Sequence, residues 1–236
     1  MRLDIHLTKF YNIQSRNKAS ELIQEKKIEI DGKIVTKSSF KVEDKHTIKI
    51  LQEEFFVSRS AYKLKHFLED NDIDVSDMEA LDIGSSTGGF TQVLLEKGIK
   101  SVACVDVGSN QLHKTIKGDS RITMYENTDI RVFKSGRSFE LITCDVSFIS
   151  ILNILKDIDR LKSDKIIILY KPQFEVGKDV KRDSNGVVKD EKAMKMARDV
   201  FLIETKKLNW KLQLCEKSQI SGKSGNVEEL FYFKIN

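Results

Sequence analysis

The sequence predicts an α/β protein in which a mostly parallel, doubly wound sheet follows a small α+β unit. Beyond residue 57, apolar runs of strand length alternate with helix-like segments, which is typical of right-handed crossovers in a parallel sheet covered on both faces. The last two runs follow each other without a helix, which favours an antiparallel hairpin at one edge. We therefore expect two domains, residues 1–57 and 58–236, and seven strands in the second.

Apolar patterning gives each element of the larger domain its bounds. The expected strands are 78–84, 100–108, 121–127, 139–147 and 164–172, followed by 210–218 and 227–235. The expected helices are 89–98, 110–118, 149–162 and an amphipathic helix at 189–209.

The first 57 residues have a different pattern. Ser15 has the character of an N-cap, and Ala19, Leu22 and Ile23 share one face of the helix that follows it. Asp31-Gly32 between two β-branched runs predicts a tight hairpin turn, and "HTIKI" is a further strand candidate. This segment is therefore a compact α+β unit of its own.

Composition excludes several classes of protein. The chain is 40% hydrophobic and 32% charged with a single proline, which is typical of a globular protein. It contains no apolar run long enough to span a bilayer, and charges interrupt "MRLDIHLTKF" where a signal peptide needs an apolar stretch. Three widely spaced cysteines and four scattered histidines predict neither a disulfide nor a metal site. We expect a cytoplasmic protein without a membrane partner.

A glycine-rich turn follows the first strand of the larger domain, in "LDIGSSTGGFT". It lacks the GK[ST] of a P-loop, and its GxxxGG spacing differs from the GxGxxG of dinucleotide-binding folds. Asp82 at the end of the strand would repel a pyrophosphate and suit a cationic ligand. S-adenosyl-L-methionine, which carries a sulfonium and an ammonium but no phosphate, fits this pattern.

Carboxylates end four successive strands, at Asp82, Asp106, Asp129 and Asp145. Asp106 is placed to accept hydrogen bonds from ribose hydroxyls, and NAD enzymes have an acid at the same position. Asp129 is placed to accept a hydrogen bond from an adenine amino group. Each acid alone is also compatible with a loop residue or a helix cap, but the four together favour S-adenosyl-L-methionine. The residues expected to bind it are Asp82, Gly84, Ser86, Gly88, Gly89, Phe90, Asp106, Asp129 and Asp145.

The small domain resembles the RNA-binding domain first described in ribosomal protein S-four. The resemblance rests on "RLD..L", "SR..A..LI" and "I.IDGK.V.K.S..V" in this order. It implies two short helices and a strand hairpin that present basic residues to phosphates of structured RNA. The residues that match these contacts are Arg2, Arg16, Lys18, Lys33 and Lys37.

The larger domain resembles the FtsJ-like methyltransferases, and the whole chain resembles the TlyA family of ribosomal RNA (cytidine-2′-O) methyltransferases, also known as haemolysins. The motifs "DIGSSTGGFT", "KPQFE", "GVVKD" and "GNVEE" carry this resemblance. It implies a Rossmann-like class I methyltransferase fold, S-adenosyl-L-methionine as cofactor and ribosomal RNA or ribosomal subunits as partner. The implied catalytic set is Lys63, Asp145, Lys171 and Glu228, with Lys65 and Glu229 as neighbouring alternatives.

Methyl transfer requires the ribose hydroxyl to lose or share its proton. Lys171 would accept that proton if it were neutral, which burial or a neighbouring cation such as Lys63 would favour. Asp145 and Glu228 would instead stabilise the charged lysine, which could then only orient the hydroxyl. The sequence is compatible with both roles of Lys171.

Phe90 stands where the wider FtsJ group commonly has a tryptophan. We expect this difference to change packing near the cofactor rather than chemistry.

Two further expectations concern the substrate. The segment 175–193 is rich in charge and glycine and is expected to be a mobile loop, in which Lys178, Lys181 and Arg182 either grip RNA phosphates or are solvated. The chain ends two residues after "FYFK", and from this shortness we expect a large-subunit cytidine as target, with the small subunit as a further possibility. The alternatives to an enzyme are a membrane-active haemolysin and a non-catalytic ribosome assembly factor.

Overall fold

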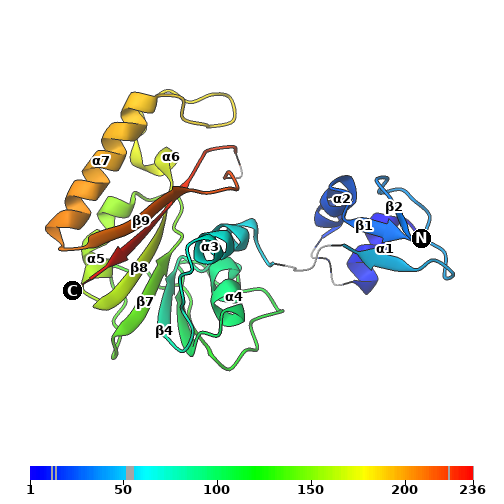
Figure 1. The fold of residues 1–236 in the computed structure, drawn as a ribbon, viewed down its shortest axis with the longest axis horizontal. Coiled ribbons are helices and arrows are strands. Elements are labelled where there is room, and N and C mark those ends of the chain that lie inside the picture. The colour runs from blue at the N-terminus through cyan, green and yellow to red at the C-terminus, as the bar shows by residue number, and fades with distance from the viewer. Residues whose placement is uncertain (12, 14, 52–55, 223, 236) are drawn as a thin grey trace. The chain divides into compact units, whose positions relative to one another are not determined.

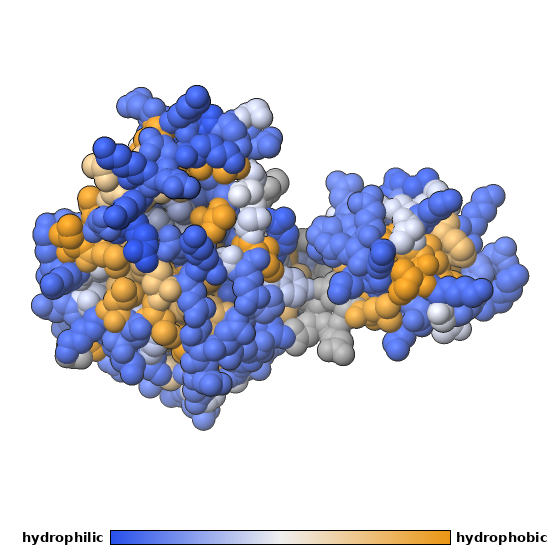
Figure 2. Space-filling view, turned by 45° about the horizontal axis from the view of Figure 1, so that its top comes forward, coloured by the Kyte–Doolittle hydropathy of each residue, from blue (hydrophilic) through white to orange (hydrophobic). Residues whose placement is uncertain are grey.

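The computed structural model describes residues 1–11, 13, 15–51, 56–222 and 224–235, and the chain divides into two compact units, Met1–Phe55 and Phe56–Asn236 (Figure 1). Each unit has its own hydrophobic core. In the view of Figure 2 the surface of each unit is mostly hydrophilic, with apolar side chains in separate patches. Among the described residues, none of the helices is long and apolar enough to cross a membrane.

The small unit packs two helices on a three-stranded antiparallel sheet with the order β2-β1-β3. Ser15 caps the second helix through a hydrogen bond from the Lys18 amide, and Asp31 and Gly32 make the predicted turn with positive φ. Leu7, Leu22 and their neighbours form the core. The elements are α1 (Leu3–Phe10), α2 (Arg16–Gln24), β1 (Ile28–Ile30), β2 (Lys33–Ile34) and β3 (Ile48–Ile50).

The large unit is built on a seven-stranded sheet with the order β6-β5-β4-β7-β8-β10-β9. Strands β4 to β8 are parallel, and β10 runs antiparallel to both β8 and β9. The predicted parallel sheet with a closing hairpin is therefore confirmed. The strands are β4 (Glu79–Ile83), β5 (Ser101–Val105), β6 (Ile122–Tyr125), β7 (Phe139–Cys144), β8 (Ser163–Tyr170), β9 (Lys211–Lys217) and β10 (Glu229–Lys234).

Helices cover both faces of this sheet. Helices α3 and α4 pack on one face around Leu64 and Leu94, and α5, the 3-10 turn η1 and α7 pack on the other around Ile158 and Phe201. Alternate strand residues therefore lie in different cores, as Val102 and Ala103 do. The helices are α3 (Arg59–Asp70), α4 (Gly89–Glu96), η1 (Ile151–Asn153), α5 (Leu155–Asp159), α6 (Pro172–Glu175) and α7 (Glu191–Lys207).

Two predicted helices were wrong in detail. Segment 110–118 forms turns, because the His113 amide bonds to the Thr87 carbonyl and ties the segment to the glycine-rich turn. Leu112 and Ile116 are buried there, and their helical spacing reflects burial alone. Segment 149–162 divides into η1 and α5, and the Glu175 carboxylate accepts from the Ile151 amide at the start of η1.

Candidate catalytic and cofactor site

The glycine-rich turn lies between the carboxyl ends of β4 and β7, where the chain connections diverge to either side of the sheet. Gly84 has φ +76°, and a Cβ there would lie 2.8 Å from the Asp145 carbonyl oxygen. Gly88 has φ +91°, and its Cβ would lie 2.4 Å from Ile116 Cδ1. A side chain would be strained by the positive φ at both positions, and at Gly84 it would also clash with backbone atoms.

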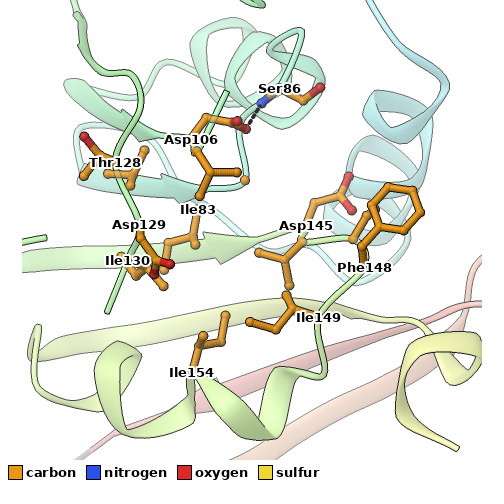
Figure 3. A pocket seen from close by; sticks show the side chains of 15 residues that line it. Ile83, Ser86, Asp106, Thr128, Asp129, Ile130, Asp145, Phe148, Ile149 and Ile154 are labelled. Carbon is orange, nitrogen blue, oxygen red and sulfur yellow. Dashed lines mark hydrogen bonds between the residues drawn. The ribbon is translucent and has the colours of Figure 1, made fainter. Parts of the chain in front are cut away.

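A cavity of about 330 Å³ lies beyond these strand ends (Figure 3). Figure 3 shows Asp106, Asp129 and Asp145 around it, from the segments that follow β5, β6 and β7. Its other walls are largely apolar, which suits a flat ring with polar contacts only at its edges. The apolar lining includes Ile83, Val105, Val107, Ile130, Ile149 and Ile154.

Asp106 is 8% exposed and is held by backbone donors. Its Oδ2 accepts from the Ser86 amide over 2.8 Å and its Oδ1 from the Gly108 amide over 2.7 Å. Gln111 Nε2 also donates to Oδ1, over 3.4 Å, so Oδ2 is the oxygen with capacity left for a ligand hydroxyl. Ser86 itself has φ +46°, a conformation that directs its amide to Asp106.

Asp129 lines the cavity but already forms an ion pair. Arg131 donates to both of its oxygens, with Nη2 lying 2.6 Å from Oδ2. This guanidinium holds the pKa of the Asp129 carboxyl below its usual value. The orientation of the Asp129 carboxylate is therefore fixed by Arg131.

Asp82, which we expected to contact the cofactor, points into the core instead. It is 0% exposed, and its oxygens accept from the hydroxyls of Thr91 over 2.6 Å and Thr143 over 2.9 Å. Burial raises the pKa of this carboxyl to about 6. The sequence correctly predicts an acid at the end of this strand. It does not show whether the side chain faces the cofactor or the core.

A second cavity, of about 140 Å³, adjoins the first and shares Gly84, Ser86, Asp145 and Ser147 with it. Hydroxyl groups and Lys171 dominate its lining, and Phe90 closes it from the core, where its side chain is 2% exposed. The close approach of α3 to the turn explains Gly89, because a Cβ there would lie 2.0 Å from Ser58 Oγ. The remaining lining residues are Ser58, Ser60, Ser85 and Thr87.

Lys171 and Asp145 form an ion pair where the two cavities meet. Nζ of Lys171 lies 2.6 Å from Oδ1 of Asp145 and donates to Ser147 Oγ over 2.8 Å. Both side chains are largely buried, at 11% and 15% exposure. Lys171 directly follows β8 and precedes Pro172, which starts a one-turn helix and fixes the direction of the chain.

Lys63 and Glu228 form a second, more deeply buried pair. Nζ of Lys63 on α3 lies 2.5 Å from Oε2 of Glu228, and Gln173 Nε2 donates to Oε1 over 3.0 Å. The neighbouring alternatives have other partners, since Lys65 lies 3.8 Å from Glu69 and Glu229 pairs with Arg198 over 2.9 Å. All four residues of the expected catalytic set are thus paired.

Three residues around this site escaped sequence reasoning. Ser147 contacts Lys171, and Gln173 contacts Glu228. Phe148 is 92% exposed at the cavity, with φ +66° and its ring 5.3 Å from that of Phe174. The sequence marks these three residues only by their position, two or three residues after Asp145 or Lys171. Many loop residues have such a position without any function.

The basic residues of the small unit divide into paired and exposed groups. Arg2 and Arg16 both pair with Asp4 over 3.0 Å, and the hydrogen bond from Arg2 is the main cause that lowers the pKa of Asp4 to about 2. Lys18 pairs with Glu21 over 2.9 Å. Lys33 and Lys37, in and after β2, are exposed.

The guanidinium of Arg182, an expected phosphate contact, is occupied by carbonyl groups of the protein itself. It donates to the carbonyl oxygens of Gln173, Gly177, Lys178 and Val180, over 2.8 to 3.1 Å. The loop after α6 is therefore organised around this side chain. The neighbouring lysines of that loop, Lys178 and Lys181, are exposed.

Family models match nearly the entire chain. The FtsJ-like methyltransferase model matches residues 56–235, and the S4 domain model matches residues 1–48. The match to the FtsJ-like model covers the whole sheet and every residue of the two ion pairs.

Individual proteins are similar over the same span. The chain is 48% identical to the 23S rRNA (cytidine-2'-O)-methyltransferase TlyA of Campylobacter jejuni subsp. jejuni serotype O:23/36 (strain 81-176), with 100% of both chains covered. It is 36% identical to the 16S/23S rRNA (cytidine-2'-O)-methyltransferase TlyA of Mycobacterium tuberculosis (strain CDC 1551 / Oshkosh), with 99% of this chain and 89% of the other covered. A solved structure from Streptococcus thermophilus, named as a hemolysin, has a TM-score of 0.74 and 29% identity, with 100% of this chain and 88% of that chain covered.

Proposed function

Because the chain belongs to the TlyA family of FtsJ-like methyltransferases, we propose that it transfers a methyl group from S-adenosyl-L-methionine to the ribose 2′-hydroxyl of a cytidine in ribosomal RNA. The position of Lys171 is the observation that supports this reaction most strongly. Lys171 Nζ lies beside Asp145 and Ser147 where the two cavities meet. A nucleophile and a methyl donor in adjoining cavities would meet at that point.

The residues of the larger cavity fit S-adenosyl-L-methionine. Asp106 keeps acceptor capacity for the ribose hydroxyls, and Asp129 offers a charged acceptor to the adenine amino group. Asp145 carries negative charge where the cation would lie, and Gly84 leaves room for close approach of the ligand to the backbone. When bound, the cofactor supplies an activated methyl group on a sulfonium, and no metal is required for its transfer.

Asp82 contributes indirectly in this proposal. Its bonds to Thr91 on α4 and Thr143 on β7 tie the end of β4, where the glycine-rich turn begins, to both of these elements. Gly84 and Ser86 are thereby held where they line the cavity. The acid therefore preserves the shape of the turn rather than touching the ligand.

The ion pairs orient the hydroxyl and take up its proton. Lys171, paired as an ammonium with Asp145, donates hydrogen bonds that hold the hydroxyl oxygen in the line of attack. Oδ1 of Asp145 is in contact with this ammonium, so the other carboxylate oxygen, Oδ2, would be the one that accepts from the hydroxyl. The proton then passes to Asp145 directly, or to Lys171 once Lys171 has given a proton to Asp145. Lys63 and Glu228 form the second charged pair of this set.

The S4-type unit is proposed to dock the RNA. Exposed Lys33 and Lys37 contact phosphates, and Arg2 and Arg16 contribute positive charge in excess of the single carboxylate of Asp4. Lys18 would add a further contact beside Glu21. Contacts of this kind fix the position of the protein on structured RNA without reading its sequence.

The proposed target is a cytidine of the large ribosomal subunit, acted on in the cytoplasm where ribosomes are assembled. The relative of 48% identity is named for 23S rRNA, whereas that of 36% identity is named for both 16S and 23S rRNA. The small subunit is therefore the second substrate to examine.

The test is direct. Purified protein is incubated with separate ribosomal subunits and radiolabelled S-adenosylmethionine, and the modified nucleotide is mapped by mass spectrometry. We expect label on the 2′-oxygen of a large-subunit cytidine, and none with Lys171→Ala. Folded protein that binds RNA but leaves it unlabelled would indicate an assembly factor, and red-cell lysis at the same protein concentration would indicate a haemolysin.

A further inference from the structure

The side chain of Gln173 contacts the buried Lys63–Glu228 pair. Its Nε2 donates to Oε1 of Glu228 over 3.0 Å, while Nζ of Lys63 lies 2.5 Å from Oε2. Each carboxylate oxygen therefore has its own donor, and the two donors come from different elements, α6 and α3. Two donors on different oxygens fix the plane of a carboxylate, which a single donor leaves free to rotate.

The same helical turn carries the other ion pair. Lys171 is the N-cap of α6 and reaches Asp145, and Gln173 is two residues further along and reaches Glu228. Pro172 lies between them at the first helical position, where its fixed φ limits backbone movement. One short, rigid turn thus connects the two charged pairs of the site.

The backbone of Gln173 is also anchored. Arg182 donates to its carbonyl oxygen over 3.1 Å and, with its other donors, to the carbonyls of Gly177, Lys178 and Val180. The loop that follows α6 therefore folds back onto the residue. The charged groups that contact Gln173 are Glu228 at its side chain and Arg182 at its carbonyl, with Lys63 on the far oxygen of Glu228.

Electrostatics sets which way the amide points. Oε1 of Gln173 is buried and has no hydrogen-bond partner among the described residues. Turning the amide over would place that oxygen against Oε1 of Glu228, where two acceptors repel each other. The amide therefore keeps its donor on the carboxylate, although its own oxygen stays unpaired.

Glu228 has little room to adopt another position. A Cβ on Gly222 would lie 2.5 Å from Oε1 of Glu228, so the loop before β10 packs closely against the carboxylate. The Glu228 side chain is 4% exposed, and its carbonyl accepts from the Ser218 amide over 2.8 Å. Its orientation therefore depends on its two donors and on this packing, not on solvent.

We propose that Gln173 is a positioning residue for methyl transfer. Acting through Glu228, it holds the Lys63 ammonium in a fixed place relative to the Lys171–Asp145 pair. This inference rests on the proposed function, since it concerns the same reaction. A positioning role changes the rate of the chemical step and leaves binding of both substrates unchanged.

Two substitutions test this role. Gln173→Met keeps the length of the side chain and removes the donor, and Gln173→Glu places a second carboxylate beside Glu228. In single-turnover assays on ribosomal RNA, Gln173→Met should lower the methyl-transfer rate about tenfold or more, with the RNA KM and the S-adenosylmethionine Kd within about twofold of wild type. Gln173→Glu should lose more activity at pH 8 than at pH 6, because adjacent carboxylates share a proton at lower pH.

The control is Gln213→Met, on the exposed edge strand β9, which should match wild type in rate and pH profile. Circular dichroism and S-adenosylmethionine binding establish that each variant is folded. A Gln173→Met rate within about twofold of wild type, or a wild-type pH profile in Gln173→Glu, overturns the positioning role. Wild-type protein that fails to methylate ribosomal RNA contradicts the proposed function instead, and the two failures are distinguishable.

Discussion

Lys171 and Asp145 leave the carboxyl ends of adjacent parallel strands, β8 and β7, and their charged atoms lie 2.6 Å apart. The pairing of Cys144 with Ile168 brings the two strand ends to the same edge of the sheet. Burial reduces the screening of this pair by water, so each charge orients the other more strongly than on an open surface. The site therefore has charged groups already in place before a substrate arrives.

Lys171→Met should reduce methyl transfer at least about a hundredfold, because the variant loses the ammonium that orients the hydroxyl and takes part in proton transfer. Binding of S-adenosylmethionine should change little, since Lys171 lines the smaller cavity and not the larger one. The measurement is single-turnover methylation beside calorimetric cofactor binding. Lys206→Met, on the exposed end of α7, is the matched control. Turnover near wild type in folded Lys171→Met protein contradicts the role.

Asp106→Ala should weaken cofactor binding about tenfold to a hundredfold, because hydrogen bonds to a charged group contribute about 1.5–3 kcal/mol. The variant also leaves the Ser86 and Gly108 amides without their acceptor. Isothermal titration calorimetry gives the Kd, and Asp199→Ala, on the exposed face of α7, is the control. Equal Kd values for the two variants would show that Asp106 does not face the ligand.

Asp82→Asn should alter the pH dependence of stability. The pKa of this carboxyl is raised by burial to about 6 in the folded protein, so the folded state binds more protons than the unfolded state between about pH 4 and pH 6. Wild-type stability contributed by this group is therefore present at low pH and lost as the pH rises through 6.

Asparagine does not titrate, so the unfolding free energy of Asp82→Asn relative to wild type should rise by up to about 3 kcal/mol between pH 4 and pH 7. Urea unfolding at several pH values measures this difference. A constant difference between the two proteins across that range contradicts the raised pKa.

Gly84→Ala should destabilise the large unit by about 1–3 kcal/mol and weaken cofactor binding, because the residue has positive φ and its Cβ would lie 2.8 Å from the Asp145 carbonyl oxygen. Thermal unfolding and calorimetry are the measurements. Gly118→Ala is the matched control, since a Cβ there meets nothing within 4 Å among the described residues. Equal melting temperatures for both variants would argue against a constrained turn.

Lys33→Ala with Lys37→Ala should weaken RNA binding and make its salt dependence shallower by about one unit of log–log slope per lost phosphate contact. The methyl-transfer rate at saturating RNA should stay the same, because these residues belong to the small unit. Filter binding at several salt concentrations gives the slope. An unchanged slope in the double variant means that these lysines do not contact phosphates.

Much of the fold follows from local pattern. The strand-length runs, the hairpin of β9 and β10, the Ser15 cap and the Asp31-Gly32 turn are all correctly predicted. These features depend on periodicity and on turn chemistry, which neighbouring residues determine. Segment 110–118 shows the limit, because buried residues at helical spacing look alike whether the chain between them forms a helix or turns.

The sequence by itself determined the type of fold, the glycine-rich turn and the identity of the charged residues at the strand ends. Only the tertiary structure decided which partners the polar side chains take: Asp82 faces two threonines in the core, Arg182 binds loop carbonyls, and Gln173 donates to Glu228. The physical reason is that a polar side chain takes the partner nearest in space. That partner comes from another element, and its place is set only when the strands and helices pack together.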